Sequence, residues 1–185
     1  MLSRMAYLGV DCSSPYLALA LYDGVVLASF CEDVDRDHAK RITGALDTLF
    51  AQAGLTPEDL LGVTVGVGPG SYTGLRVGVA TAQGLARGLN LPLRGESTLS
   101  AMAVGVLSDA QPHAVVALDA RRGNVYAGVF RFGAGEVRPQ GGLVKGARAE
   151  LSAKGIPYFE NRPPDAGFLA RRGALGANAV TPIYL

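Results

Sequence analysis

The stretch of sequence that decides the fold is GVGPGSYTGLRVGVATAQGLARGLNLP, residues 66–92. It follows a β-rich run at residues 62–67 and passes through a glycine-rich loop. Apolar residues then recur at spacings of three and four from Leu75 to Leu89, which predicts an amphipathic helix. A strand, a glycine turn and a helix in direct succession are typical of an α/β protein.

The glycine-rich loop, residues 68–74, has two interpretations that the sequence leaves open. A loop between a strand and a helix can present backbone N–H groups to a phosphate, which makes Gly68, Gly70 and Ser71 candidate phosphate-proximal residues. The same glycines can instead form a tight turn that lets helix and sheet pack closely. The loop lacks the Gly-Lys-Ser/Thr ending of a P-loop and the Gly-x-Ser-x-Gly elbow of a serine hydrolase.

Upstream of this stretch, three short apolar runs predict strands at residues 7–11, 16–22 and 25–31, with a hairpin turn at Asp23-Gly24. Asp11 ends the first run and is followed by two serines after Cys12. It is a candidate phosphate-proximal acid, and it is equally well explained as a turn-capping aspartate.

Apolar periodicity predicts a second helix over residues 38–53, stopped by Gly54, and a third over 98–107. We expect His38 to lie at a solvated helix end. A polar break at residues 109–112 suggests a boundary near residue 110, which divides the chain into 1–110 and 111–185.

The second half begins with a predicted hairpin, in which Asp119 ends the first strand and Arg121-Arg122-Gly123 form the turn. Residues 133–164 are rich in glycine and proline with short apolar patches, and the sequence leaves their structure open. A helix is expected within 165–175, and the tail, 179–185, is expected to be extended. The arginines are interpreted as solvated turn residues rather than a phosphate clamp.

Composition limits the class of protein. The 185 residues are 49% hydrophobic and 18% charged, with a net charge of +1, so a compact core is expected and no strong field attracts nucleic acid or membrane. The two histidines, His38 and His113, have no neighbouring ligands at metal spacing. With only Cys12 and Cys31 and no apolar run long enough to span a bilayer, we expect a reduced cytoplasmic protein without a metal.

Several segments together resemble one family. They are LGVDCSS (8–14), DHAKRITGALDTLF (37–50), the stretch 66–92, STLSAMA (97–103), ALDARRGNVYAGVF (117–130) and TPIYL (181–185). In this order they are similar to the TsaB family, also called YeaZ. The resemblance implies an actin-like/ASKHA (ribonuclease H-like) α/β fold of two related subdomains, with mixed sheets flanked by helices. Residues 1–110 would carry the partner-binding helices, and 111–185 would form a shortened second subdomain.

The resemblance also implies a function. TsaB-like chains are non-catalytic partners of TsaD, which synthesises N6-threonylcarbamoyladenosine at position 37 of bacterial tRNA together with the ATPase TsaE. TsaD-like catalysts carry a metal-binding histidine pair where this chain has residues 96–102, ESTLSAM. A catalytic metal site is therefore not expected here. We expect a homodimer in isolation, contact with tRNA only through the complex, no intrinsic cofactor, and ATP or ADP, if bound, in the complex with TsaD and TsaE.

The family places the partner interface on the two helices at 38–53 and 75–89. The candidate interface residues are Ile42, Leu46, Leu49, Gly74, Gly78 and Ala82. The alternative is that these residues cover the sheet of their own subdomain. Two other functions stay open at this level: an ATP-dependent phosphotransferase of the actin-like/sugar-kinase class, suggested by Asp11 and the glycine-rich loop, and a glycoprotease-like metallopeptidase.

Overall fold

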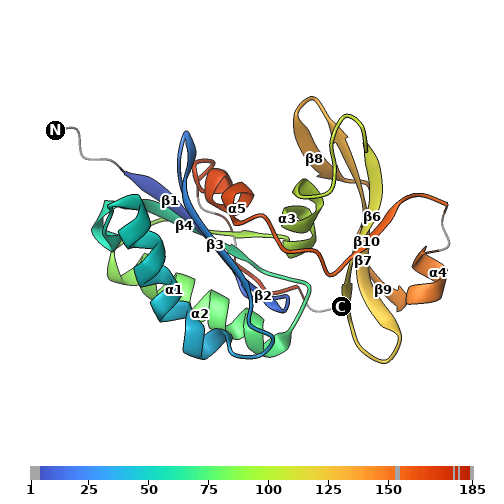
Figure 1. Ribbon diagram of the computed structural model, residues 1–185, viewed down its shortest axis with the longest axis horizontal. Coiled ribbons are helices and arrows are strands. Elements are labelled where there is room, and N and C mark those ends of the chain that lie inside the picture. Colours follow the sequence, from blue (N-terminus) through green and yellow to red (C-terminus); the bar gives the residue numbers. More distant parts are fainter. Residues whose placement is uncertain (1–4, 153–154, 177, 179, 184–185) are drawn as a thin grey trace.

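The computed structural model describes residues 5–152, 155–176, 178 and 180–183. They form two lobes, each built on a mixed sheet, with the first lobe carrying the longer helices (Figure 1). The first sheet has the strand order β3-β2-β1-β4-β5. Its strands are β1 (Ala6–Asp11), β2 (Tyr16–Asp23), β3 (Val25–Asp33), β4 (Leu60–Gly66) and β5 (Leu93–Glu96).

Two helices cover one face of this sheet: α1 (His38–Ala53) and α2 (Tyr72–Gly88) (Figure 1). The end of α1 and the start of α2 follow from local sequence. Gly54 adopts a left-handed conformation at φ 66° after α1, and Ser71 caps α2 by accepting a hydrogen bond from the Gly74 N–H at 3.2 Å. A single 3₁₀ turn, Pro57–Asp59, leads from α1 into β4. The two predicted helices are confirmed within a few residues of their bounds.

The opposite face is covered by α5 (Ala166–Gly173), the last helix of the chain (Figure 1). Strand β2 shows why both faces are buried. Its leucines, 17, 19 and 21, join the core under α1 and α2, while Ala18 and Ala20 pack with Ala166 of α5. Small residues on one side of the strand let α5 approach closely.

The second sheet has the order β10-β6-β7-β8, and β9 also pairs with β7. Its strands are β6 (His113–Asp119), β7 (Asn124–Gly133), β8 (Glu136–Pro139), β9 (Val144–Ala147) and β10 (Tyr158–Glu160). Helix α3 (Thr98–Val104) packs on the face toward the first lobe, and the five-residue α4 (Arg148–Ser152) lies on the other side (Figure 1).

The structure departs from the predicted elements at α3, which ends at Val104, before Gly105, and not at residue 107. Residues 133–164, whose structure the sequence left open, contain β8, β9, α4 and β10. In the tail, which was expected to be extended, the Ile183 N–H donates to the Val67 carbonyl oxygen at 2.7 Å. Residues 177, 179, 184 and 185 lie outside the described residues. The domain boundary near residue 110 stays a prediction. Helix α5 follows that residue in the sequence but packs on the first sheet.

Among the described residues, no helix is long and apolar enough to cross a membrane.

Candidate functional site

Asp11 lies fully buried at the end of β1, at the junction of the two lobes. Its Oδ1 accepts hydrogen bonds from the Ser13 N–H at 2.8 Å and the Ser13 hydroxyl at 2.7 Å. Its Oδ2 accepts from the Thr98 hydroxyl at 2.7 Å. Thr98 in turn accepts a hydrogen bond from the Gly68 N–H at 3.2 Å. Asp11 therefore ties β1 to the glycine-rich loop and to the start of α3.

The Ser13 and Thr98 hydroxyls also contact each other. Ser13 Oγ and Thr98 Oγ1 lie 2.5 Å apart, in addition to the contact of each with Asp11. Either hydroxyl can be the donor in this contact. Burial raises the pKa of Asp11, and the hydrogen bonds from Thr98 and Ser13 offset part of that rise. Asp11 is thus a buried connector, and its carboxyl does not line the cleft described below.

The glycines of α2 pack against the segment that follows β1. A side chain at Gly74 would collide with the carbonyl oxygen of Cys12, and one at Gly78 would lie 3.3 Å from the Cys12 Cβ. Ala82, one turn further, is fully buried. The small-residue stripe thus serves close packing within this chain.

The candidate interface residues on α1 are also buried. Ile42, Leu46 and Leu49 are between 0 and 9% exposed and belong to the core between α1 and the first sheet. For all six candidates the side chains pack within this chain, against its own sheet or the segment after β1. A role for these residues in a partner contact stays a prediction. Whether the two helices contact a partner through their outer faces stays a prediction.

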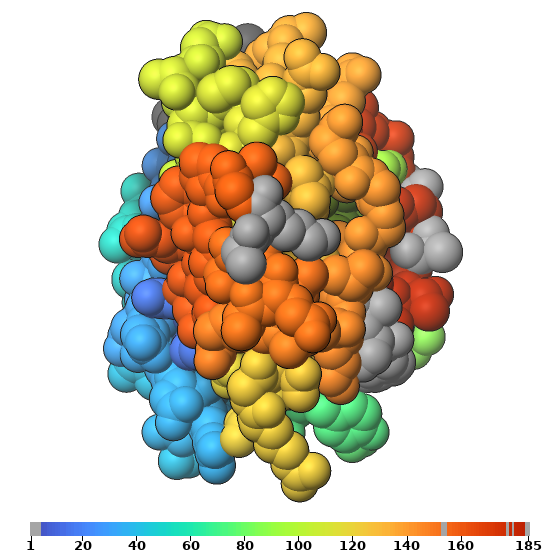
Figure 2. Space-filling view, turned by 90° about the vertical axis from the view of Figure 1, so that its right-hand side faces the viewer, coloured from blue at the N-terminus to red at the C-terminus, as the bar shows by residue number. Residues whose placement is uncertain are grey.

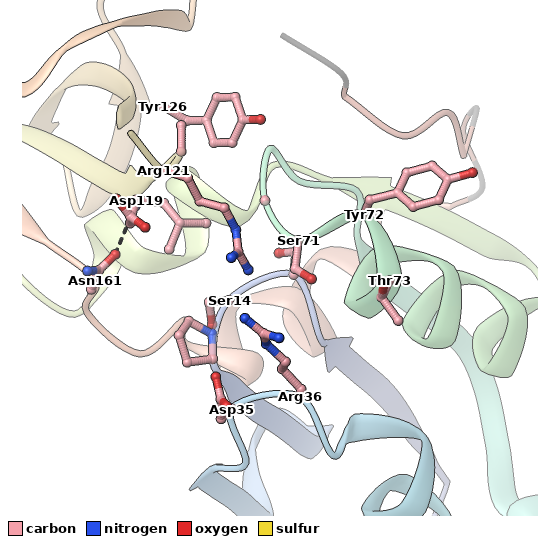
Figure 3. Close-up of a pocket in the computed structure, with 15 residues that line it drawn as sticks. Ser14, Asp35, Arg36, Ser71, Tyr72, Thr73, Asp119, Arg121, Tyr126 and Asn161 are labelled. Atoms are coloured by element: carbon pink, nitrogen blue, oxygen red, sulfur yellow. Dashed lines mark hydrogen bonds between the residues drawn. The ribbon is translucent and has the colours of Figure 1, made fainter. Parts of the chain in front are cut away.

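A cleft of about 460 Å³ opens between the two lobes. Figure 3 shows what lines it: the turn after β1, the loop before α1, the start of α2 and the β6–β7 turn. In the space-filling view the β6–β7 turn (yellow) projects at the lower edge between the blue segment around the start of α1 and the green start of α2 (Figure 2). The guanidinium groups of Arg36 and Arg121 point toward one another there, beside Ser71 (Figure 3).

The structure separates the four candidate phosphate-proximal residues into two pairs. Gly70 and Ser71 line the cleft, whereas Asp11 and Gly68 are engaged in the buried network beneath it. Sequence reasoning did not single out Arg36 or Ser14, because a lone basic residue before a helix and a serine in a turn carry no recognisable pattern. It interpreted Arg121 as a solvated turn residue.

An ion-pair cluster borders the same cleft. Arg148, the first residue of α4, contacts Glu160 Oε1 at 2.7 Å and Asp119 Oδ1 at 2.9 Å. The hydrogen bonds from Arg148 lower the pKa of Glu160, and burial raises the pKa of Tyr158 to about 12. Asp119, which ends β6, shares Arg148 with Glu160. It does not meet Asp11, which is buried and absent from the cleft lining.

Three smaller predictions can be compared with the structure. His38 is 3% exposed, not solvated, because the start of α1 packs on β2 and its Nε2 lies 3.2 Å from the Tyr16 carbonyl oxygen. Cys12 and Cys31 are both free, and burial raises the pKa of the Cys12 thiol. Over the described part of the chain, no group of three or more His, Cys, Asp or Glu residues is arranged to hold a metal.

Comparisons with known proteins bear on this geometry. The family model described as TsaD, tRNA N6-adenosine threonylcarbamoyltransferase, matches residues 22–154. The tRNA threonylcarbamoyladenosine biosynthesis protein TsaB of Escherichia coli (strain K12) is 35% identical over 152 residues, which are 81% of this chain and 63% of that protein. The protein of the same name from Bacillus subtilis (strain 168) is 33% identical over 135 residues, 69% of this chain and 56% of that protein. The chain thus spans about three fifths of the length of these relatives.

Solved structures match over nearly the whole chain. YeaZ from Pseudomonas aeruginosa superposes with a TM-score of 0.81 at 25% identity, covering 98% of this chain and 100% of that one. A second Pseudomonas aeruginosa structure, described as an uncharacterized protein with similarity to peptidase YEAZ, gives a TM-score of 0.85 at 23% identity over 98% and 99% of the two chains, a likeness of fold. The predicted α/β architecture of two mixed sheets flanked by helices is confirmed, and the chain belongs to the TsaB (YeaZ) family.

Proposed function

We propose that this chain is the non-catalytic, TsaB-type subunit of the bacterial system that makes N6-threonylcarbamoyladenosine at position 37 of tRNA. It binds and supports a TsaD-like catalyst, and a TsaE-like ATPase joins them. The chain acts in the cytoplasm, forms a homodimer when alone, and meets tRNA only through the complex. It has no intrinsic cofactor, and any ATP or ADP is bound together with TsaD and TsaE.

The observation that carries this proposal is the use of the residues at 96–102. Where TsaD-like catalysts bind metal, this chain has Ser97, whose hydroxyl caps α3, and Thr98, whose hydroxyl is bonded to Asp11. Ser97 thus serves its own helix, and Thr98 ties the start of α3 to the end of β1. The same network occupies Asp11, the acid on which a phosphotransferase would depend, so the kinase and metallopeptidase alternatives are not favoured.

Partner binding is assigned to the outer faces of α1 and α2, since their inner faces are buried. Many of the exposed residues on these two helices have small side chains. They are Thr43, Gly44, Thr48 and Ala51 on α1, and Thr73, Ala80 and Gly84 on α2. A side chain added at Gly44 or Gly84 would meet nothing within 4 Å in this chain. Such a face lets a helix of another protein approach closely, and a bulky substituent on it leaves the monomer undisturbed.

The test is a matched pair of substitutions from alanine to glutamate. Ala80→Glu places a charge on the proposed face, and Ala149→Glu places the same charge on exposed α4 in the second lobe. Co-purification with a TsaD-like protein is expected to fall by about a hundredfold for the first, because a buried unpaired charge is costly, and to be unchanged for the second. Melting temperatures check that both variants fold.

Activity provides the second readout. The modified nucleoside, measured by mass spectrometry of tRNA, is expected only when the chain is mixed with TsaD-like and TsaE-like proteins and ATP. ATP turnover, proteolysis or tRNA modification by the chain alone would overturn the proposal, as would equal TsaD binding by the Ala80→Glu and Ala149→Glu variants.

A further inference from the structure

A strip of arginines crosses the β7–β8 hairpin and the end of α5. We call Arg131, Arg138, Arg171 and Arg172 the arginine strip. Arg131 and Arg138 line a hollow of about 300 Å³, and Arg138, Arg171 and Arg172 line a second hollow of about 730 Å³ between the hairpin and α5. Because Arg138 belongs to both hollows, the strip is continuous. It lies at the other end of β7 from the β6–β7 turn and the cleft (Figure 1).

The pairing of β7 with β8 places two of these charges side by side. Arg131 is directly opposite Arg138 in the antiparallel ladder, so both side chains leave the same face of the sheet, and His113 of β6 is next in the same row. The hairpin is otherwise regular, with a two-residue turn at Ala134 and Gly135, both at positive φ. Like charges directly opposite each other destabilise a sheet, so their presence on a regular hairpin indicates a role in binding an anion.

Carboxylates of the chain neutralise only part of the charge of the strip. Glu136 contacts Arg138 at 2.9 Å, and one oxygen of Glu96 accepts hydrogen bonds from Arg172 at 3.0 Å and from Arg94 at 2.8 Å. Two glutamates therefore serve three arginines.

The other two arginines of the strip, Arg131 and Arg171, are exposed and have no carboxylate partner among the described residues. Arg171 lies 5.9 Å from the ring centre of Phe168. Hydrogen bonding to Arg138 lowers the pKa of Glu136, and the charges of Arg172 and Arg171 lower it further, so the field of α5 extends across the larger hollow to the hairpin. The strip thus keeps a net positive charge on an open surface.

We propose that the arginine strip binds the phosphate backbone of the tRNA held in the complex with TsaD, an inference that rests on the proposed function. A continuous row of exposed guanidiniums suits a chain of phosphates, whereas one small anion would fill only part of it. Residues 94–185 contain eleven lysines and arginines and seven acids, so the positive charge of a nearly neutral chain is concentrated in this part. Contacts of this kind position an RNA without reading its bases, a contribution that suits a non-catalytic subunit.

The test compares two double variants of the whole chain in complex with a TsaD-like protein. Arg131→Gln/Arg171→Gln removes the two charges that have no carboxylate partner and so breaks no ion pair of the described residues. The affinity of the complex for fluorescent tRNA at about 0.15 M salt is expected to fall about tenfold, and the slope of log affinity against log salt is expected to become shallower by about one to two. The control, Arg122→Gln/Arg162→Gln, removes two exposed charges of the second lobe that lie outside both hollows, and its affinity is expected to stay within about twofold of wild type.

Three outcomes would overturn the proposal: an unchanged affinity for the strip variant, equal losses for the two double variants, or competition by polyglutamate as effective as that by RNA of equal charge. The last would assign the strip to an acidic protein. Co-purification with the TsaD-like protein is measured on the same samples, so a failure of the proposed function is seen separately. If the chain does not bind that protein, tRNA is titrated with the chain alone at low salt, where a loss for the strip variant and not for the control is again expected, and equal affinities overturn the proposal.

Discussion

The two sheets of this protein are covered in different ways. The first sheet lies between α1 and α2 on one face and α5 on the other, with backbone approaching backbone at glycine and alanine. The second sheet packs α3 on its inner face, but its outer face has only the five-residue α4 and the Arg148 ion-pair cluster. The second lobe also has buried apolar clusters, but its ion pairs lie at a partly exposed surface. A substitution at a close backbone contact of the first lobe is therefore expected to cost more than one in this ion-pair cluster.

The largest effect is expected at Gly9, in the middle of β1. A Cβ there would collide with the backbone of α5, at the Ala166 carbonyl oxygen and 2.6 Å from the Ala170 nitrogen. Gly9→Ala is therefore expected to lower the free energy of unfolding by about 3 kcal/mol, measured by urea denaturation.

Gly44→Ala is the matched control, because Gly44 lies on the exposed side of α1 with open space around it. It is expected to raise the free energy of unfolding by about 0.5–1 kcal/mol, through helix propensity. If Gly9→Ala lowered the free energy of unfolding by less than Gly44→Ala raised it, the description of the first lobe as closely packed would be wrong.

A smaller but pH-dependent effect is expected at the junction of the lobes. Asp11→Ala leaves the Ser13 and Thr98 hydroxyls without their buried partner and is expected to cost about 2–3 kcal/mol. Asp11→Asn keeps an oxygen acceptor and nearly the same shape, so it is expected to cost much less.

The sign of the pH dependence follows from burial, which raises the pKa of Asp11 in the folded chain. Its stabilising contribution is fully present below the unfolded pKa and is lost as pH rises through the folded pKa. Wild type is therefore expected to lose stability relative to Asp11→Asn as pH rises above the ordinary pKa of an aspartate. A difference between the two proteins that stays constant with pH would contradict a raised pKa for Asp11.

The smallest effect is expected in the second lobe, at Glu160. Hydrogen bonds from Arg148 lower its pKa, so its contribution is present above the unfolded pKa and is lost as pH falls through the folded pKa. Glu160→Gln is expected to cost about 1 kcal/mol or less near neutral pH and nothing in acid. Exposed Glu150 on α4 supplies the control, and a cost for Glu150→Gln equal to that of Glu160→Gln would show that the cluster contributes nothing specific.

Much of the first lobe was predictable because its signals are local. The periodicity of α1 and α2, Gly54, and the serine that caps α2 all act within a few residues, and the predicted bounds agree with the structure. The second lobe was less predictable because β8, β9 and β10 are three or four residues long, too short for a period to show. Strand β8 forms a tight hairpin with β7, whereas β9 and β10 pair with parts of β7 and β6 that are farther away in sequence.

The candidate site was also only partly predictable from the sequence. Sequence singled out Asp11 and the glycine-rich loop from their positions after strands, but it could not tell whether that aspartate faces solvent or is buried. Thr98 decides this, 87 residues away. Likewise the candidate interface residues are apolar or small at helical spacing, a pattern that fits a core and an interface equally well, and only the packed structure places them in the core.

The sequence by itself determined the class of fold, the two long helices and the family, because these depend on local periodicity, capping and contiguous motifs. Tertiary structure decided that α5 returns to cover the first sheet, that Asp11 is buried in a hydroxyl network, and that Arg36 and Arg121 face one another across a cleft. Each of these joins segments far apart in the chain. Such contacts are selected by complementary shape and charge between whole elements, which no short window of sequence contains.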